Sequence, residues 1–566
     1  MYLRTTKRKN KDGSVVTYYQ LAHNVRHPET NQPTAHVIHN FGRADQLDRQ
    51  QLVRLCQSIA KVCELNVTDP LQVSEPALDT PLVDLPESLQ LIRTMELGTL
   101  LVIEALWERL GMGKTLREVA AQSGCQVPYE RALLAMTANR LCEPESKLGV
   151  WDRWLKKVYL PSCQQLKLQQ MYEAMDLLAQ HSQQVEEAIF FQTASLLDLE
   201  VDLVFYDTTP VDFSIDMEDE ETEDDEALRQ YGRPRNGSWS VQMVVALAVT
   251  REGLPVRSWV FPGSTTDVTT VAKVKRDLKG WKLGRALFVG DGGLNSEENR
   301  HELAKACGTY LLATRLNSVN EVHQDVLSRP GRYRKVSDNL HVIIGGQGVR
   351  RRRYLLCYNP REAKRQRRRR KQIVQQLEQE LATHRNMSAT AQWAINLLAS
   401  PRTKRYLTIT QKAQIRLDRK AIQQAARTDG KWVVQTNDDT LTPEDAACAY
   451  KGLTVIERCF RTLKRTQLKL EPVYHRLSRR IEAHVKICVM ALLIERVAEL
   501  ECGQSWSRIR HSLADLQVTE FHTSSHLFFK RNEASPELRN MLKKLAIPLP
   551  KSVLEIIPLP EDTPET

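Results

Sequence analysis

The spacing of hydrophobic residues changes several times along the chain and predicts a series of different structural segments. Near the N-terminus, the runs Val15–Tyr19 and Ala35–His39 are rich in β-branched and aromatic residues and predict short strands between polar turns. Residues 50–65 and 87–195 carry apolar residues three or four positions apart, which is typical of amphipathic helices. The proline-rich stretch Pro70–Pro86 predicts a linker between them.

The middle of the chain has the pattern of an α/β domain. Two continuous apolar runs, Val201–Asp207 and Ala286–Asp291, predict buried strands that each end in an aspartate. Further elements are expected around them: a hairpin over 240–249 and 256–261, helices over 266–279 and from Ser296, and a strand over 310–314.

Beyond residue 320 the chain becomes strongly basic, and the helical period then returns. Arg350–Arg353 are four consecutive arginines, and eight of the eleven residues Arg361–Lys371 are basic. The second cluster opens a predicted helix. Two more helices with apolar periodicity are predicted over 443–465 and 475–500.

The charge distribution favours a polyanionic partner. The chain has 80 Lys and Arg against 69 Asp and Glu, a net charge of +11 over 566 residues. Nine of the eleven residues Asp216–Glu226 are acidic, so adding those nine back to +11 leaves about +20 on the rest of the chain. On net charge alone, a solvated charged surface explains the surplus equally well. The acidic run lies between the first two strands predicted for the core, and we interpret it as a flexible loop.

Several classes of protein are excluded by the sequence. No run of 18 apolar residues predicts a membrane span, and the basic N-terminus has no apolar region behind it, so we expect a cytoplasmic protein. The eleven cysteines lack zinc-site spacing. Gly113-Lys114-Thr115 is no phosphate-binding loop because Glu108 stands where its first glycine is needed, and Gly290–Gly293 is no dinucleotide motif, so no nucleotide cofactor is expected.

Asp207 and Asp291 are the first candidates for chemistry. Each ends an apolar strand and is followed by small or hydroxyl residues, Thr208-Thr209 and Gly292-Gly293. Ligands of α/β sheets bind at the carboxyl ends of strands, where two carboxylates can share Mg²⁺. Taken singly, each aspartate is better explained as a cap of the following turn.

A third acid lies in the helix predicted over 443–465. Five residues of that helix lie on one face: Tyr450, Leu453, Glu457, Arg461 and Lys464. Their spacings of 3, 4, 4 and 3 residues match the period of an α-helix. The neighbouring apolar stripe is predicted to pack on the sheet and consists of Ile456, Phe460 and Leu463. Glu457 would then face the edge of the sheet as a metal-binding acid beside basic groups that contact phosphate. The alternative is an exposed Glu–Arg pair.

With these motifs the sequence resembles the DDE transposases of bacterial insertion sequences, in the branch with a Y-(2)-R-(3)-E-(6)-K signature around the last acid. Tyr450, Glu457 and Lys464 match that signature, whereas Leu453 occupies its arginine position. The resemblance also covers the motifs Phe205–Thr209, Val289–Gly293, Cys357–Pro360, Asp429–Lys431 and Pro472–His475. It spans most of the chain from about 90 to 530, and the N-terminal segment looks similar too.

The resemblance implies an α/β fold with a ribonuclease-H-like catalytic core, interrupted by a β-rich insertion and preceded by a small β unit and a helical domain. It implies that Asp207, Asp291 and Glu457 are the catalytic, metal-binding acids. Two Mg²⁺ ions, with Mn²⁺ as a substitute, would flank the phosphate cut at the end of the element. The freed 3′-OH would then be joined to target DNA, with or without a hairpin intermediate.

The expected DNA contacts come from two groups of residues. Tyr450 and Lys464 are expected to hold the 5′-side phosphate, with Arg458 or Arg461 in place of the missing arginine. Sequence-independent contacts to the DNA backbone are expected from Arg350, Arg351, Arg352, Arg353, Arg367 and Arg368. The alternative for these clusters is a solvated helix face.

The expected domains are a basic DNA-binding β/helical unit (1–75), a helical domain (87–195), the first part of the core (196–319), the insertion (320–440), the last part of the core (441–500) and a C-terminal tail (501–566). The expected partners are double-stranded DNA, as the terminal inverted repeats and the target, and a second copy of the chain in a homodimer on DNA. A membrane is not among them. In a bacterial cell the protein would be cytoplasmic and associated with the nucleoid.

Three other interpretations remain open on the sequence. The first is a nuclease of the same superfamily that cuts without joining. The second is a non-catalytic DNA-binding protein derived from a transposase, which the intact acids Asp207, Asp291 and Glu457 argue against. The third is a metal-binding protein that takes up Ca²⁺ through residues 216–226.

Overall fold

The computed structural model describes most of the chain: residues 2–9, 15–26, 33–43, 89–124, 128–221, 227–232, 239–314, 334–337, 340–348, 352–384, 392–411, 414–523 and 525–559. The chain divides into two units, Met1–Leu89 and Gln90–Thr566. The helix predicted over 50–65 and the linker Pro70–Pro86 lie outside the described residues.

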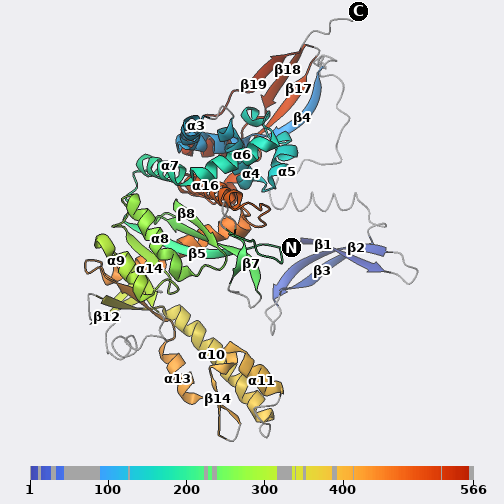
Figure 1. The fold of residues 1–566 in the computed structure, drawn as a ribbon. Coiled ribbons are helices and arrows are strands. Elements are labelled where there is room, and N and C mark those ends of the chain that lie inside the picture. Colours follow the sequence, from blue (N-terminus) through green and yellow to red (C-terminus); the bar gives the residue numbers. More distant parts are fainter. Residues whose placement is uncertain are drawn as a thin grey trace, which may run out of the picture. The chain divides into compact units, whose positions relative to one another are not determined.

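The first unit contains a three-stranded antiparallel sheet. Its strands are β1 (Tyr2–Lys9), β2 (Val15–Arg26) and β3 (Pro33–Arg43), in the order β1-β2-β3 (Figure 1). The two strands predicted near the N-terminus are thereby confirmed as parts of β2 and β3.

The second unit is a mixed α/β structure built on a large sheet. The described part of this sheet has ten strands: β5 (Leu203–Asp212), β6 (Gln230–Gly232), β7 (Ser240–Val249), β8 (Pro255–Pro262), β9 (Leu287–Gly290), β10 (Tyr310–Thr314), β11 (Arg334–Ser337), β12 (Leu340–Gly348), β13 (Arg352–Tyr358) and β16 (Lys431–Thr436). They lie in the order β11-β12-β13-β16-β10-β9-β5-β7-β6, and β8 also pairs with β7. β5, β9 and β10 are parallel, whereas β7 runs antiparallel to β5.

Helices cover both faces of this sheet, as the continuous apolar strands require. On one face, Val204, Tyr206 and Phe288 pack with side chains of α8 (Asp267–Gly280) and α9 (Glu297–Ala304). On the other face, Leu203, Phe205 and Val289 belong to a core shared with α14 (Pro443–Lys451), α15 (Thr454–Arg461) and α16 (Ser478–Cys502). The hairpin β7–β8 and the helix predicted over 266–279 are confirmed.

The predicted helical region shares its core with the sheet domain. Its helices are α2 (Gly98–Arg109), α3 (Met112–Gln122), α4 (Tyr129–Cys142), α5 (Lys147–Asp152), α6 (Leu168–Gln180) and α7 (Ser182–Leu196), with short 3₁₀ turns at Trp154–Lys156 and Pro161–Cys163. The long helix α16 packs against α4, α6 and β8 (Figure 1). Because α16 is buried along most of its length, it joins the helical region to the sheet in one hydrophobic core.

Residues 90–96 form a strand, β4 (Gln90–Glu96), where the sequence pattern predicted helix. β4 pairs with β17 (Gln517–His522) in the four-stranded sheet β19-β18-β17-β4, and Arg93 forms an ion pair with Glu520 at 2.6 Å. The expected C-terminal tail is thus largely folded. It also contributes α17 (Trp506–Leu513), β18 (His526–Arg531), α18 (Pro536–Lys544) and β19 (Val553–Pro558).

The segment 320–440, which we expected to be a β-rich insertion, has two structurally different parts. β11, β12, β13 and β16 extend the large sheet beyond β10. The part between β13 and β16 is mainly helical, with α10 (Pro360–Thr383), α11 (Gln392–Ala399), α12 (Pro401–Lys404) and α13 (Arg419–Arg427) around the hairpin β14 (Leu407–Ile409) and β15 (Ile415–Leu417). A small core of Ile373, Leu377 and Tyr406 holds this part together.

The helix predicted over 443–465 is divided into α14 and α15 at Gly452, and a π-helical turn, η5 (Thr462–Thr466), follows. The predicted burial of Ile456, Phe460 and Leu463 is confirmed. Of the helices that the structure describes, none is both long and apolar enough to cross a membrane.

Candidate active site

Asp207 and Asp291 lie side by side on neighbouring parallel strands. The last residue pair in the register of β5 and β9 is Phe205 with Val289, and each aspartate lies two residues further on. Since strand residues alternate between faces, both aspartates share the face of Phe205 and Val289, which is covered by α14 and α15. Asp291 directly follows β9 as expected, but β5 continues to Asp212, so Asp207 lies within its strand.

A close approach of the α14–α15 junction to β5 positions the third acid. A Cβ placed on Gly452 would lie 2.4 Å from Cζ of Phe205, so only glycine fits at this contact. α15 packs on β5 and β7, while α14 packs on β9 and β10. Ile456 is buried against the sheet, and Glu457 is exposed next to it.

The phenol of Tyr450 is partly buried close to the candidate acids. Burial raises the pKa of Tyr450 to about 12, and the nearby Asp291, Cys357, Glu457 and Asp207 act in the same direction. The three candidate acids are thus among the groups that influence this phenol. Within the described residues, however, no three or more His, Cys, Asp or Glu side chains are already grouped to hold a metal ion.

Main-chain groups orient the two aspartates. The N–H of Thr208 donates to Oδ1 of Asp207 at 2.8 Å, and the N–H of Gly293 donates to Oδ1 of Asp291 at 2.8 Å. Each bond fixes the orientation of its carboxylate. The donor set at this edge of the sheet is made of carboxylate oxygens, which fits Mg²⁺ or Mn²⁺ better than a softer metal.

A fourth acid, Asp267, lies near Asp291 and was missed by the sequence analysis. The Thr208 hydroxyl donates to Oδ1 of Asp267, at the first residue of α8. A Cβ on Gly293 would lie 3.1 Å from Oδ1 of Asp291 and 3.7 Å from Oδ2 of Asp267, so both carboxylates border the same point. The sequence offered no signal beyond an aspartate at a helix start, which is a common cap.

The residues expected to hold the 5′-side phosphate differ in their exposure and in their contacts with the rest of the chain. Arg458 and Arg461 are exposed on α15, while Leu453, at the arginine position of the signature, is buried in the core. Nζ of Lys464 lies 3.0 Å from Oε1 of Glu471 and also donates to the main-chain oxygen of Pro210 in β5. Lys464 therefore ties the end of α15 to the strand that carries Asp207.

The two arginine clusters have different structural settings. Arg350 and Arg351 lie outside the described residues, and Arg352 begins β13. The Arg353 side chain donates to the main-chain oxygen of Leu441 at 2.5 Å, so it binds its own chain. By contrast, Arg367 and Arg368 of the second cluster are exposed on α10.

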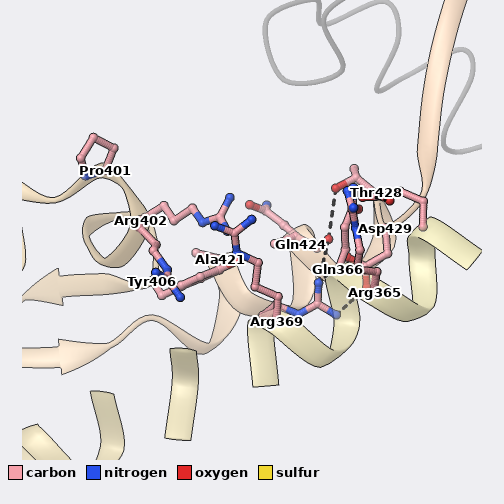
Figure 2. A pocket seen from close by; sticks show the side chains of 14 residues that line it. Arg365, Gln366, Arg369, Pro401, Arg402, Tyr406, Ala421, Gln424, Thr428 and Asp429 are labelled. Atoms are coloured by element: carbon pink, nitrogen blue, oxygen red, sulfur yellow. Dashed lines mark hydrogen bonds and ion pairs between the residues drawn. The ribbon is translucent and has the colours of Figure 1, made fainter. Parts of the chain in front are cut away.

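A basic pocket of about 940 Å³ lies between α10, α12 and α13 (Figure 2). Five arginines line it: Arg365, Arg369, Arg370, Arg402 and Arg405. Two of them are neutralised, because Arg370 pairs with Asp429 at 2.5 Å and Arg365 with Glu362 at 2.9 Å. Among the described residues, no carboxylate forms an ion pair with the other three. Arg402 and Arg405 were not predicted, since only folding brings them beside α10.

Comparison with known families identifies the class of protein. The family model of the transposase DDE domain matches residues 209–494, more than half of the chain, and that of the IS1634 family transposase N-terminal domain matches residues 3–69. The chain therefore belongs to the DDE transposases of insertion sequences. It is a DNA-cutting transposition enzyme, and the DDE match contains both Asp291 and Glu457.

No curated protein matches the chain. Among solved structures, the piggyBac transposase synaptic complex with hairpin DNA is similar at 10% sequence identity and a TM-score of 0.35, over 74% of this chain and 79% of that one.

Proposed function

We propose that Asp207, Asp291 and Glu457 are the catalytic acids of this transposase, and that it cuts DNA at the ends of an insertion sequence and joins the 3′-OH to target DNA. The observation that carries this proposal is the register of β5 and β9, which brings Asp207 and Asp291 to one level beneath the helix of Glu457. Asp267 supports Asp207 through the Thr208 hydroxyl.

The order of the central strands supports a ribonuclease-H-like core. β8-β7-β5-β9-β10 lie side by side, with β5, β9 and β10 parallel and β7 antiparallel to them. The polypeptide leaves this core after β10 and returns at α14, so the segment between them is the insertion. Its outer, mainly helical part carries the basic pocket.

Divalent Mg²⁺, or Mn²⁺ in its place, would be held by Asp207, Asp291 and Glu457 and would polarise the scissile phosphate and activate the attacking hydroxyl. The main-chain N–H groups of Thr208 and Gly293 hold two of these carboxylates in place. Arg458 and Arg461, exposed one and four residues beyond Glu457, bind the phosphates beside the cut. Tyr450 packs next to the acids and positions the 5′-side phosphate together with Lys464.

The remaining DNA contacts follow from charge. Arg369, Arg402 and Arg405 in the basic pocket, with Arg367 and Arg368 outside it, bind the DNA backbone regardless of sequence. The N-terminal unit and the helical region recognise the terminal inverted repeats. Two copies of the chain act together on the two ends of the element, in association with the nucleoid.

The test is an assay of cleavage and strand transfer on a plasmid that carries the element with its own ends. Glu457→Gln should lower cleavage about a thousandfold, because one ligand of a catalytic ion contributes several kcal/mol to the transition state. DNA binding should persist. Asp202→Asn is the matched control, since Asp202 lies just before β5 and pairs only at the surface with Arg251. Undiminished cleavage by Glu457→Gln would refute the assignment, and cleavage without joined products would favour a nuclease.

A further inference from the structure

A second, smaller pocket lies apart from the three acids, where α4, α5, α6 and α16 meet the segment 469–475. Its volume is about 160 Å³. One water takes up about 30 Å³ of liquid, so the cavity has room for a group of several heavy atoms. Five potential cations line it: Arg140, Lys147, Lys469, His475 and His484.

The positive charges in this pocket have no carboxylate partner. Arg140 is 4% exposed and Lys147 is 3% exposed. The two acids that line the pocket are engaged elsewhere, since Glu145 pairs with Arg153 at 2.8 Å and Glu471 with Lys464 at 3.0 Å. In the described part of the chain, neither Arg140 nor Lys147 forms an ion pair. Buried charges without a partner are costly, so such an arrangement calls for an anion.

Arg140 and Lys147 also have N–H groups that make no hydrogen bond to the described atoms. Nε of Arg140 is buried without a partner among the described atoms, although its other nitrogens donate to Asn139 and to main-chain oxygens. The Lys147 ammonium has one contact at hydrogen-bonding distance, 3.5 Å to Nδ1 of His484. Nε2 of His484 lies 3.2 Å from the main-chain oxygen of Leu470, which leaves Nδ1 as the acceptor for Lys147.

Burial disfavours the charged forms of the basic groups in this pocket. Burial lowers the pKa of Lys147 to about 7, and the nearby Arg140 acts in the same direction. Burial also lowers the pKa of His475 to about 3, with Lys147, Arg480 and Arg140 adding to the effect and Asp176 opposing it. An anion in the pocket would reverse these shifts and restore the charge on Lys147.

Side-chain contacts connect this pocket to the catalytic strand. Glu471 lines the pocket, pairs with Lys464 of η5 and accepts from the main-chain N–H of Asp212 at 3.4 Å, at the end of β5. Tyr474, 74% exposed, belongs to the lining and offers an aromatic surface to solvent. Glu471 therefore links this pocket to the end of β5, the strand that carries Asp207.

We propose that this pocket binds a phosphate group of the DNA substrate, with Arg140 and Lys147 as its ligands. The inference rests on the proposed function, because it takes DNA as the source of the phosphate. It assigns to the helical region a contact with the DNA backbone close to the site of cleavage.

The test compares full-length wild-type protein with Lys147→Met. Without an anion, Lys147→Met should leave the unfolding temperature unchanged or raise it, because it removes an uncompensated buried charge. Inorganic phosphate should raise the unfolding temperature of the wild type and not that of Lys147→Met. The variant should bind a short DNA duplex about tenfold more weakly, and the slope of log affinity against log salt should fall by about one.

Two further variants keep the test decisive. Lys147→Arg retains the charge and should keep the stabilisation by phosphate. Lys305→Met removes an exposed lysine outside the helical region, paired with Glu302, and should change neither readout. If Lys147→Met lowers the unfolding temperature without anion and binds DNA like the wild type, Lys147 is structural and the proposal is overturned.

If phosphate stabilises only the wild type and DNA affinity is the same in both proteins, the pocket binds a free anion and the assignment to DNA is overturned. The proposed function fails separately, through undiminished cleavage by Glu457→Gln. The two failures can therefore be told apart.

Discussion

Asp207 and Asp291 stand at the same level on two adjacent parallel strands, each two residues beyond the pair Phe205–Val289. Nothing local in the sequence sets this relationship. It follows from two apolar runs, 84 residues apart, that pair in one register and present every second residue to the same helices. The acids meet because Phe205 and Val289 are both buried on that face.

The contact at Gly452 predicts a loss of both stability and activity on substitution. Gly452→Ala places a methyl group against the ring of Phe205, which would push α15 away from β5 and cost about 1–3 kcal/mol. Chemical denaturation gives the change in unfolding free energy. Gly280→Ala is the control, because a Cβ there meets nothing within 4 Å. Equal stability of the two variants would mean that the close approach is not needed.

Asp267 is predicted to support the metal site without being one of the three catalytic acids. Asp267→Asn weakens the hold of the Thr208 hydroxyl beside Asp207, so cleavage should require more Mg²⁺ and be about 10–100-fold slower at low Mg²⁺. The measurement is the cleavage rate across a Mg²⁺ titration, with Asp202→Asn as the control. A titration curve that coincides with the wild type would exclude this role.

The basic pocket of the insertion predicts sequence-independent DNA binding. Arg402→Gln and Arg405→Gln should each weaken binding to any duplex and lower the slope of log affinity against log salt by about 0.9. Fluorescence anisotropy at several salt concentrations measures both quantities. Arg427→Gln, exposed on α13 and not part of the lining, should leave the slope unchanged. An unchanged slope in the pocket variants would place the DNA elsewhere.

The buried carboxyl of Glu495 should make the free energy of unfolding depend on pH. Burial raises the pKa of this carboxyl to about 8, the neighbouring Glu499 adds to the rise, and Arg496 and Thr462 oppose it. The protonated folded form is favoured, so the stability that Glu495 contributes is full below pH 4.5 and is lost as the pH rises through 8.

Glu495→Gln should therefore stabilise the protein at pH 8 by at least about 1 kcal/mol and change little at pH 4.5. Urea unfolding at the two pH values measures this difference. The exposed Glu378→Gln serves as the control. A gain that is the same at both pH values would show that Glu495 does not titrate in this range.

The sequence predicted the elements that local patterns specify and missed the contacts between residues that are distant along the chain. The strands β5 and β9 and the helices α8 and α9 were predicted because continuous apolar runs and helical periods are local patterns. β4 was predicted as helix because its pairing with β17, more than 400 residues away, leaves no local signal. For the same reason the sequence did not reveal that Lys147 meets His484, or that Arg402 meets α10.

The three candidate acids were found because each stands in a recognisable local motif. Asp267 was not found, because its link to Asp207 runs through the Thr208 hydroxyl on the opposite face of β5. The sequence also predicted one continuous helix around Glu457. The break at Gly452 arises from the tight contact with Phe205, which no helical period encodes.

Binding of Mn²⁺ to the full-length protein tests the central claim most directly. We expect Asp207→Asn, Asp291→Asn and Glu457→Gln each to weaken Mn²⁺ binding in isothermal titration in the presence of DNA, while Asp202→Asn binds like the wild type. Wild-type affinity for Mn²⁺ in all three variants would contradict the claim that these acids form one metal site.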